Sequence, residues 1–151
     1  MENSAPFQKI VVPLDGSREA ERALPHAEQI ARGGGSELIL LHVYKPAGME
    51  YTADAALAQQ MTHIEQARHN AEQYVKGLRS RIASRNINVR TQLVESNDFP
   101  QSVCQFVESE GADVVVMRAS HHSHLVNVLL GDATQRVSGC VQACLLLVRG
   151  D

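Results

Sequence analysis

The segment KIVVPLDGS, residues 9–17, joins a short apolar run to a polar turn. Residues 10–14 are apolar on both faces of an extended chain and rich in β-branched side chains, which is typical of a buried strand in a parallel sheet. Asp15 and Gly16 favour a tight turn, and Ser17 is a suitable N-cap for a helix that follows. The segment therefore predicts a strand, a turn and a helix in direct succession.

Four further segments have the composition of strands. Three of them are apolar on both faces, which again indicates buried parallel strands. The fourth alternates between apolar and polar residues, which suits a half-exposed edge strand. The apolar segments are residues 38–43, 114–117 and 144–148, and the alternating segment is residues 87–94.

Helical patterns separate these strands. An alanine-rich face between residues 20 and 31 predicts the first helix, which Pro25 should kink in its second turn and the glycines at 33–35 should end. A long apolar stripe predicts a helix over residues 57–82, and we interpret the stripe as core rather than as a partner groove. It consists of Leu57, Met61, Ile64, Ala71, Val75, Leu78 and Ile82.

Two shorter patterns predict helices over residues 99–107 and 130–140, the second starting beside Gly131. Strands and helices therefore alternate along the chain. Because strands joined by single helices pair in parallel through right-handed crossovers, the sequence predicts an α/β protein. Its architecture should be an open parallel five-stranded sheet with helices on both faces.

Composition narrows the class of protein. With 151 residues, 44% of them hydrophobic, the chain suits a single domain over residues 1–151. A net charge of −3 and the absence of Trp argue against nucleic acid and anionic membranes as partners. Because residues 1–8 lack the pattern of a secretion signal and no apolar run reaches membrane-spanning length, we expect a cytoplasmic protein.

The three cysteines are Cys104, Cys140 and Cys144. They form no CxxC motif and leave an odd thiol, which suits a reducing compartment better than a disulfide framework. We interpret all three as small core residues.

Four segments together carry the pattern of a known family. Residues 9–17 are similar to the first strand and turn of the universal stress protein family, and residues 40–43 to its second strand. Residues 112–117 resemble its fourth strand, and residues 129–137 the start of its last helix. The resemblance covers essentially the whole chain, in order and with family-like spacing.

This resemblance implies a fold and an assembly. The fold is adenine nucleotide alpha hydrolase-like, with strand order 3-2-1-4-5, and the assembly is a homodimer joined through the C-terminal strand Cys144 to Val148. Family members act in the stress response, and one branch binds ATP at the strand ends. An open parallel sheet also favours that place on physical grounds, because ligands bind where the strand order reverses.

In the ATP-binding branch, the loop after the fourth strand reads Gly, two residues, Gly, nine residues, Gly, then Ser or Thr. Aligned from Met117, this chain has Arg118 and His121 at the first two glycines. It keeps Gly131 but has Asp132 in place of the hydroxyl. Glycines let backbone N–H groups surround a phosphate, whereas a carboxylate repels it. The resemblance therefore implies a degenerate nucleotide-binding loop with weak or no ATP binding.

Other residues of the implied site lie at the ends of the first two strands. Asp15 matches a carboxylate that reaches the ribose or a phosphate-bound metal, and its alternative role is a turn residue that caps the first helix. Val43 matches the adenine-side wall, and its alternative role is that of a buried strand residue. If a nucleotide binds, the candidate contacts are Pro13, Asp15, Val43, Met117, Arg118, His121, Gly131 and Asp132.

Three imidazoles, those of His121, His122 and His124, suggest nitrogen ligands for zinc, copper or nickel. Because adjacent imidazoles do not easily face one point and the sequence places no second ligand group, we expect no metal site. We also find no Ser/His/Asp elbow and no Walker lysine motif, so we expect no catalytic residues.

The sequence therefore predicts a dimeric cytoplasmic stress-response module that binds or signals, with weak or no ATP binding, no cofactor and unknown protein partners. The alternative is an ATP- or AMP-binding switch that uses the crevice at the ends of strands 1 and 4.

Overall fold

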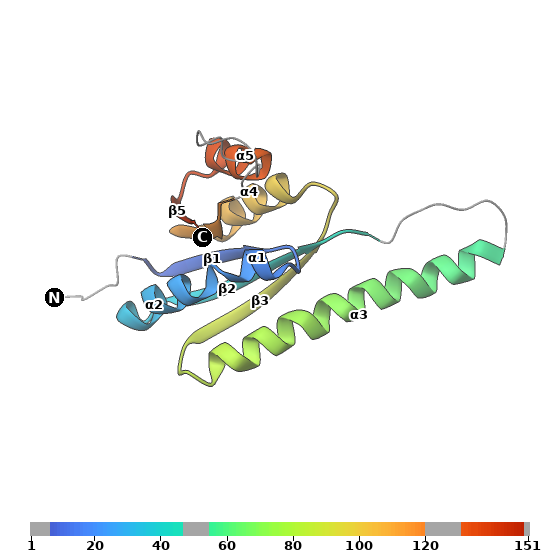
Figure 1. Ribbon diagram of the computed structural model, residues 1–151, viewed down its shortest axis with the longest axis horizontal. Coiled ribbons are helices and arrows are strands. Elements are labelled where there is room, and N and C mark those ends of the chain that lie inside the picture. Colours follow the sequence, from blue (N-terminus) through green and yellow to red (C-terminus); the bar gives the residue numbers. More distant parts are fainter. Residues whose placement is uncertain (1–6, 47–54, 120–130, 150–151) are drawn as a thin grey trace.

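The computed structural model describes residues 7–46, 55–119 and 131–149. Its centre is a five-stranded sheet in which every neighbouring pair of strands is parallel (Figure 1). The strands are β1 (Lys9–Leu14), β2 (Glu37–Tyr44), β3 (Asn88–Glu95), β4 (Val114–Arg118) and β5 (Cys144–Val148). Their order, β3-β2-β1-β4-β5, confirms the predicted α/β fold and places the alternating segment at one edge of the sheet.

Helices connect successive strands and cover both faces of the sheet. They are α1 (Arg18–Glu21), α2 (Leu24–Gly34), α3 (Ala55–Ala83), α4 (Phe99–Glu110) and α5 (Asp132–Cys140). Buried residues alternate along the strands between two core clusters. Ile10 and Val12 of β1 pack in a cluster with α2 and the end of α3, whereas Val11 packs in a second cluster with α4 and α5. The three inner strands β2, β1 and β4 are therefore buried on both sides, as their continuous apolar sequences predict. The prediction of a fully buried strand was wrong for β5, which lies at the edge of the sheet and alternates between exposed and more buried residues.

The first predicted helix is two helices in the structure. Ser17 caps α1 as expected, because its Oγ accepts a hydrogen bond from the Ala20 N–H at 3.2 Å. The prediction of one helix kinked at Pro25 was wrong. One helix ends at Glu21 and a second helix begins at Leu24. Pro25 then lies in the first turn of α2, where a missing N–H costs no hydrogen bond.

The apolar stripe on the long helix α3 was predicted to be core along its whole length, and this prediction was wrong for part of it. Ala71, Val75, Leu78 and Ile82 are buried, but Met61 is 57% exposed and Ile64 is 39% exposed. The reason is visible in the ribbon, where the N-terminal part of α3 extends beyond the end of the sheet (Figure 1). Among the stripe residues whose side chains the structure describes, only those from Ala71 onward are part of the core.

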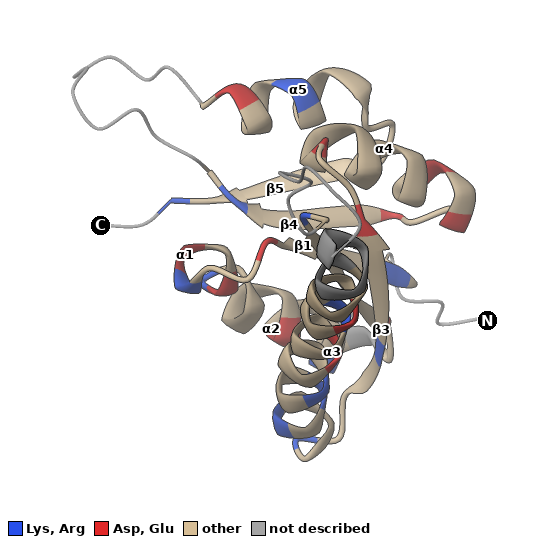
Figure 2. Ribbon diagram, turned by 90° about the vertical axis from the view of Figure 1, so that its right-hand side faces the viewer, with Lys and Arg blue, Asp and Glu red and all other residues tan. Residues whose placement is uncertain are grey.

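Charges of both signs are interspersed along α3 (Figure 2). One such pair is Arg68 and Glu72, whose Nε and Oε1 atoms are 3.2 Å apart, one turn along the helix. A mixture of this kind is typical of a solvated helix face rather than of a surface for polyanions. In the described parts of the chain, no helix is long and apolar enough to cross a bilayer.

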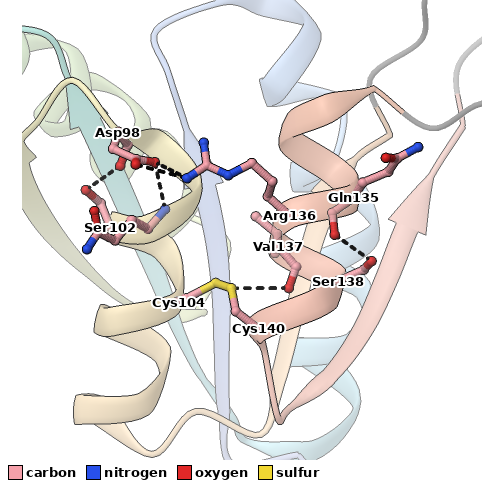
Figure 3. The surroundings of a disulfide bond; sticks show 9 residues. Asp98, Ser102, Cys104, Gln135, Arg136, Val137, Ser138 and Cys140 are labelled. Carbon is pink, nitrogen blue, oxygen red and sulfur yellow. Dashed lines mark hydrogen bonds and ion pairs between the residues drawn. A yellow bond between two sulfur atoms is a disulfide. The ribbon is translucent and has the colours of Figure 1, made fainter.

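The interpretation of the cysteines as core residues was wrong. Cys104 of α4 and Cys140 at the end of α5 form a disulfide, with Cα atoms 6.0 Å apart (Figure 3). Cys144 is a free, exposed thiol at the start of β5. The physical reason is that α4 and α5 pack against each other on the same face of the sheet, which brings two sequence-distant thiols together.

Candidate functional site

A cavity of about 1020 Å³ opens at the carboxyl ends of the strands. Its lining comes from the ends of β1, β2 and β4, the segment after β3, and all helices except α2. This cavity, called the crevice below, lies where β1 has β2 on one side and β4 on the other. Open parallel sheets bind ligands at such a reversal of strand order, so the crevice is the candidate functional site.

Most of the predicted contact residues lie together at the crevice. Pro13, Asp15, Val43, Met117 and Arg118 all line it. The pair at positions 131 and 132 directly precedes two further lining residues at positions 133 and 134, while position 121 is outside the described residues. Their grouping was predicted, but their role as nucleotide contacts stays a prediction.

Asp15 organises the turn between β1 and α1. Its Oδ1 accepts hydrogen bonds from the backbone N–H of Ser17 at 2.9 Å and from the Ser17 hydroxyl at 2.5 Å. Gly16 between them has φ of +90°, a conformation that side-chain-bearing residues rarely adopt. The turn role that the sequence offered as an alternative is therefore present, with the carboxylate exposed at the crevice.

Arg118 brings a cationic group to the crevice from the last position of β4. Its side chain is 13% exposed, and its Nη1 lies 2.9 Å from Oε2 of Glu19 on α1. The contact lacks hydrogen-bond alignment, because Nε and Nη1 are both buried without a hydrogen-bond partner. A buried guanidinium with unpaired donors is costly, since its hydration is lost without full replacement.

An aromatic wall that the sequence reasoning missed closes one side of the crevice. The His42 ring lies 4.7 Å from the Tyr74 ring and 6.0 Å from the Tyr44 ring, measured between centroids. Burial lowers the pKa of His42, although its hydrogen bond to the Leu14 carbonyl oxygen and the nearby Asp15 charge oppose that shift. Because a carbonyl oxygen only accepts hydrogen bonds, Nδ1 of His42, 3.2 Å from it, is the donor.

Part of this wall had a signal in the sequence. His42 and Tyr44 fall in the predicted strand 38–43 or directly after it, so the rule that ligands bind beyond strand ends points to them. Tyr74 had no such signal, because its position on α3 becomes relevant only once the helix packs beside β2. There its hydroxyl donates to Glu21 at 3.1 Å, and burial followed by the Glu21 charge raises the pKa of Tyr74.

An ion pair fixes the side of the crevice formed by α4 and α5. Asp98 caps α4 by accepting from the Gln101 N–H at 3.1 Å, and both of its oxygens accept from Nη2 of Arg136 on α5, at 3.1 and 2.9 Å (Figure 3). The pKa of Asp98 is lowered, first by Arg136 and then by the Gln101 N–H. The lining residues Phe99 and Thr134 are thus carried by two helices tied to each other.

Metal ligation has no support in the described part of the chain, where no three His, Cys, Asp or Glu side chains cluster suitably. The histidines at 121, 122 and 124 lie outside that part. The sequence expectations for them remain predictions.

The family model described as "Universal stress protein family" matches residues 6–149. The chain belongs to the universal stress protein family. Among curated relatives, universal stress protein MJ0531 of Methanocaldococcus jannaschii is 24% identical over 146 residues, which is 95% of this chain and 82% of that protein. The resemblance read from the sequence is therefore confirmed.

Solved structures of the family share the fold of this universal stress protein. UspA from Lactobacillus plantarum has a TM-score of 0.74 at 18% identity, covering 95% of this chain and 98% of that one. A universal stress protein in complex with cAMP has a TM-score of 0.61 at 21% identity, covering 96% and 98%. The protein from Archaeoglobus fulgidus in complex with dAMP has a TM-score of 0.56 at 17% identity, covering 93% and 97%.

Proposed function

We propose that this universal stress protein is a non-enzymatic, dimeric binding module of the cytoplasmic stress response, formed by one domain, and that its crevice binds ATP weakly or not at all. The family membership supports the stress-response role. The size and position of the crevice support a small ligand. The residues around it argue against a triphosphate.

Asp132 carries the argument against ATP. It is the first residue of α5, directly before two residues that line the crevice, and Gly131 before it provides no side-chain cap. A helix N-terminus of this kind would otherwise attract a phosphate through its free N–H groups. One carboxylate about 4 Å from one phosphate charge costs about 1 kcal/mol in water and about 4 kcal/mol at an effective dielectric near 20. A triphosphate multiplies that repulsion.

The arrangement of polar groups favours binding over catalysis. Hydrolysis or group transfer needs a base placed next to a nucleophile or a water. In the described part of the crevice, His42 directs Nδ1 to a backbone carbonyl and Asp15 is engaged by its own turn. These contacts serve the scaffold rather than a reacting group.

A nucleotide switch that accepts a single phosphate is the second candidate function. Two similar structures are complexes with cAMP and dAMP, each of which carries one phosphate. The cationic side chain of Arg118 at the crevice supports the same ligand class here. In this reading AMP binds, while the additional phosphates of ATP meet Asp132.

The dimer proposal rests on the open edge of the sheet. β5 pairs only with β4 in the described structure, and its other edge carries unpaired backbone groups. Leu146 in its centre is 41% exposed. An apolar strand with a free edge is a template for pairing with another strand. Pairing with β5 of a second copy would satisfy the backbone groups at this edge and cover Leu146.

A cytoplasmic location has to be reconciled with the disulfide. Cytoplasmic glutathione keeps most thiol pairs reduced, so a persistent Cys104–Cys140 disulfide is unusual there. We therefore propose that in the cytoplasm this disulfide forms under oxidising stress and is otherwise a pair of thiols.

The test of the proposed function is calorimetric titration of Asp132→Ser with ATP and magnesium. Removing the charge and restoring the hydroxyl should raise ATP affinity by about fivefold or more, which corresponds to about 1 kcal/mol. Adenosine, which has no phosphate, should bind equally to both proteins. Asp132→Glu is the matched control, because it keeps the charge and should gain nothing. Unchanged ATP affinity in Asp132→Ser would remove the basis for the proposal.

A further inference from the structure

We infer that Arg118 is a subsite for a single anionic group, a phosphomonoester, and that Glu19 occupies it until ligand arrives. This inference rests on the second candidate function and deepens it. It assigns the phosphate to one side chain of this chain rather than to a glycine loop. It also gives the crevice a built-in competitor for its ligand.

The position of Arg118 supports the role of receptor. Arg118 lies on β4, and its guanidinium contacts Glu19 of α1. Because α1 follows the neighbouring strand β1, this contact lies at the point where the strand order reverses. It lines the crevice and is largely buried. Nε and Nη1 have no hydrogen-bond partner there, so donors remain for an incoming oxygen anion. Guanidinium groups are well suited to phosphate oxygens.

Glu19 has the properties of a displaceable anion. Its side chain is 60% exposed, in contrast to the buried guanidinium that it contacts. Its other oxygen, Oε1, already lies 3.4 Å from Nη2 of Arg22, one turn along the chain and 49% exposed. When a ligand anion takes Arg118, Glu19 keeps a cationic partner by staying with Arg22. Figure 2 shows charges of both signs on this short helix.

The charge balance of the described lining residues favours a ligand with one phosphate group. Arg118 and Lys45 are the cationic lining residues in the described structure, and Asp15 and Glu19 are the acidic ones. Lys45 is exposed and follows β2, away from β4. A phosphomonoester, with about one and a half to two negative charges, takes the place of the Glu19 carboxylate at Arg118. A longer phosphate chain adds charges for which the described lining residues offer no further cation next to Arg118.

The alternative is that Arg118 and Glu19 form a strut that only joins β4 to α1. A strut and a subsite predict opposite consequences of removing Glu19. Loss of a strut leaves ligand affinity unchanged or lowers it. Loss of a competitor frees the guanidinium and raises affinity for anions alone.

The experiment is calorimetric titration of AMP and adenosine into four proteins: wild type, Arg118→Gln, Glu19→Gln and the double variant. Arg118→Gln should weaken AMP binding by about tenfold or more, the typical effect of losing a charge-assisted hydrogen bond. Glu19→Gln should strengthen AMP binding by about twofold to fivefold, because the ligand no longer competes with an ion pair. In the Arg118→Gln background, Glu19→Gln should have no effect. Adenosine should bind all four proteins within about twofold, because it lacks the anion.

Arg32→Gln is the matched control, since it removes one positive charge from an exposed position of α2 outside the crevice. Its AMP affinity should equal that of the wild type. Equal AMP affinity across all four proteins, or a loss of affinity in Glu19→Gln, would overturn the subsite while leaving the nucleotide switch in place. If wild type binds neither AMP nor adenosine, the nucleotide switch fails, and the subsite fails with it.

Discussion

At the scale of single residues, most of the polar side chains considered at the crevice form hydrogen bonds within the protein itself. Asp15 is held by its own turn, and His42 by the carbonyl of Leu14. Arg118 differs from both, because its nearest partner is a more exposed carboxylate and its donors are not satisfied. This contrast separates Asp15 and His42, whose contacts hold the fold, from Arg118, for which we propose a ligand.

His42 makes stability depend on pH in a predictable direction. Burial lowers its pKa below the ordinary 6.5, so the folded protein takes up this proton less readily than the unfolded chain. Its contribution to stability is complete above about pH 6.5 and is lost as the pH falls through the lower folded pKa. The free energy of unfolding should therefore fall more steeply between about pH 7 and pH 5 in wild type than in His42→Asn.

Denaturant unfolding at several pH values measures this difference. Asn keeps a donor near the position of Nδ1 and does not titrate, so the variant isolates protonation from the loss of the hydrogen bond to Leu14. His26→Asn, at an exposed position of α2, serves as the control and should keep the wild-type slope. Parallel curves for wild type and His42→Asn would contradict the assignment.

The residue-scale contacts were only partly accessible from sequence. The turn at Asp15 and the cap at Ser17 were predictable, because their partners are two or three positions away. The contact between Arg118 and Glu19 was not, because it depends on the path that α1 takes beside the two neighbouring strands β1 and β4. Contacts between near neighbours in the sequence can be predicted, whereas a contact between distant elements depends on how those elements pack.

At the scale of elements, α4 and α5 form a unit tied by the Cys104–Cys140 disulfide and the Asp98–Arg136 ion pair (Figure 3). Both helices also contribute to the crevice lining. The spacing of the cysteines gave no indication of this pairing, since spacing alone does not say which helices meet. The same limit explains α3, whose periodicity predicted a helix but not how far it would extend beyond the sheet.

Reduction of the disulfide should destabilise the protein. The two cysteines are 36 residues apart, and closing a loop of that size stabilises a fold by about 3–4 kcal/mol in the chain-entropy model. Oxidised protein should therefore unfold at lower denaturant concentration after reduction, and the double variant Cys104→Ala/Cys140→Ala should not respond to reductant.

Cys144→Ala is the control and should respond as the wild type does, because Cys144 is outside the disulfide. Thiol titration of unfolded, oxidised protein should count one thiol, and three after reduction. Three reactive thiols before reduction would show that the pair does not form.

At the scale of the whole molecule, the continuous sheet leaves β3 and β5 as its two edges. The order of the strands came from the family resemblance and was confirmed, because the structure has the order β3-β2-β1-β4-β5. The assembly does not follow from the strand order, because the topology of one chain does not specify its partner. The exposed centre of β5 is the feature that argues for self-association.

The proposed dimer should be visible by analytical ultracentrifugation as a species of twice the 16.5 kDa chain mass. Leu146→Glu places a charge on the exposed position of β5 and should give a monomer with an unchanged far-UV spectrum. Met61→Glu, at an exposed apolar position of α3, should remain a dimer. A wild-type monomer at micromolar concentration would refute this assembly.

The account as a whole depends on a retained scaffold whose loop chemistry disfavours several phosphates in a row. The most direct test is side-by-side calorimetric titration of the purified protein with AMP and with ATP and magnesium at one ionic strength. We expect ATP to bind at least about tenfold more weakly than AMP, because its extra charges meet Asp132. Submicromolar binding of ATP, tighter than that of AMP, would contradict the account.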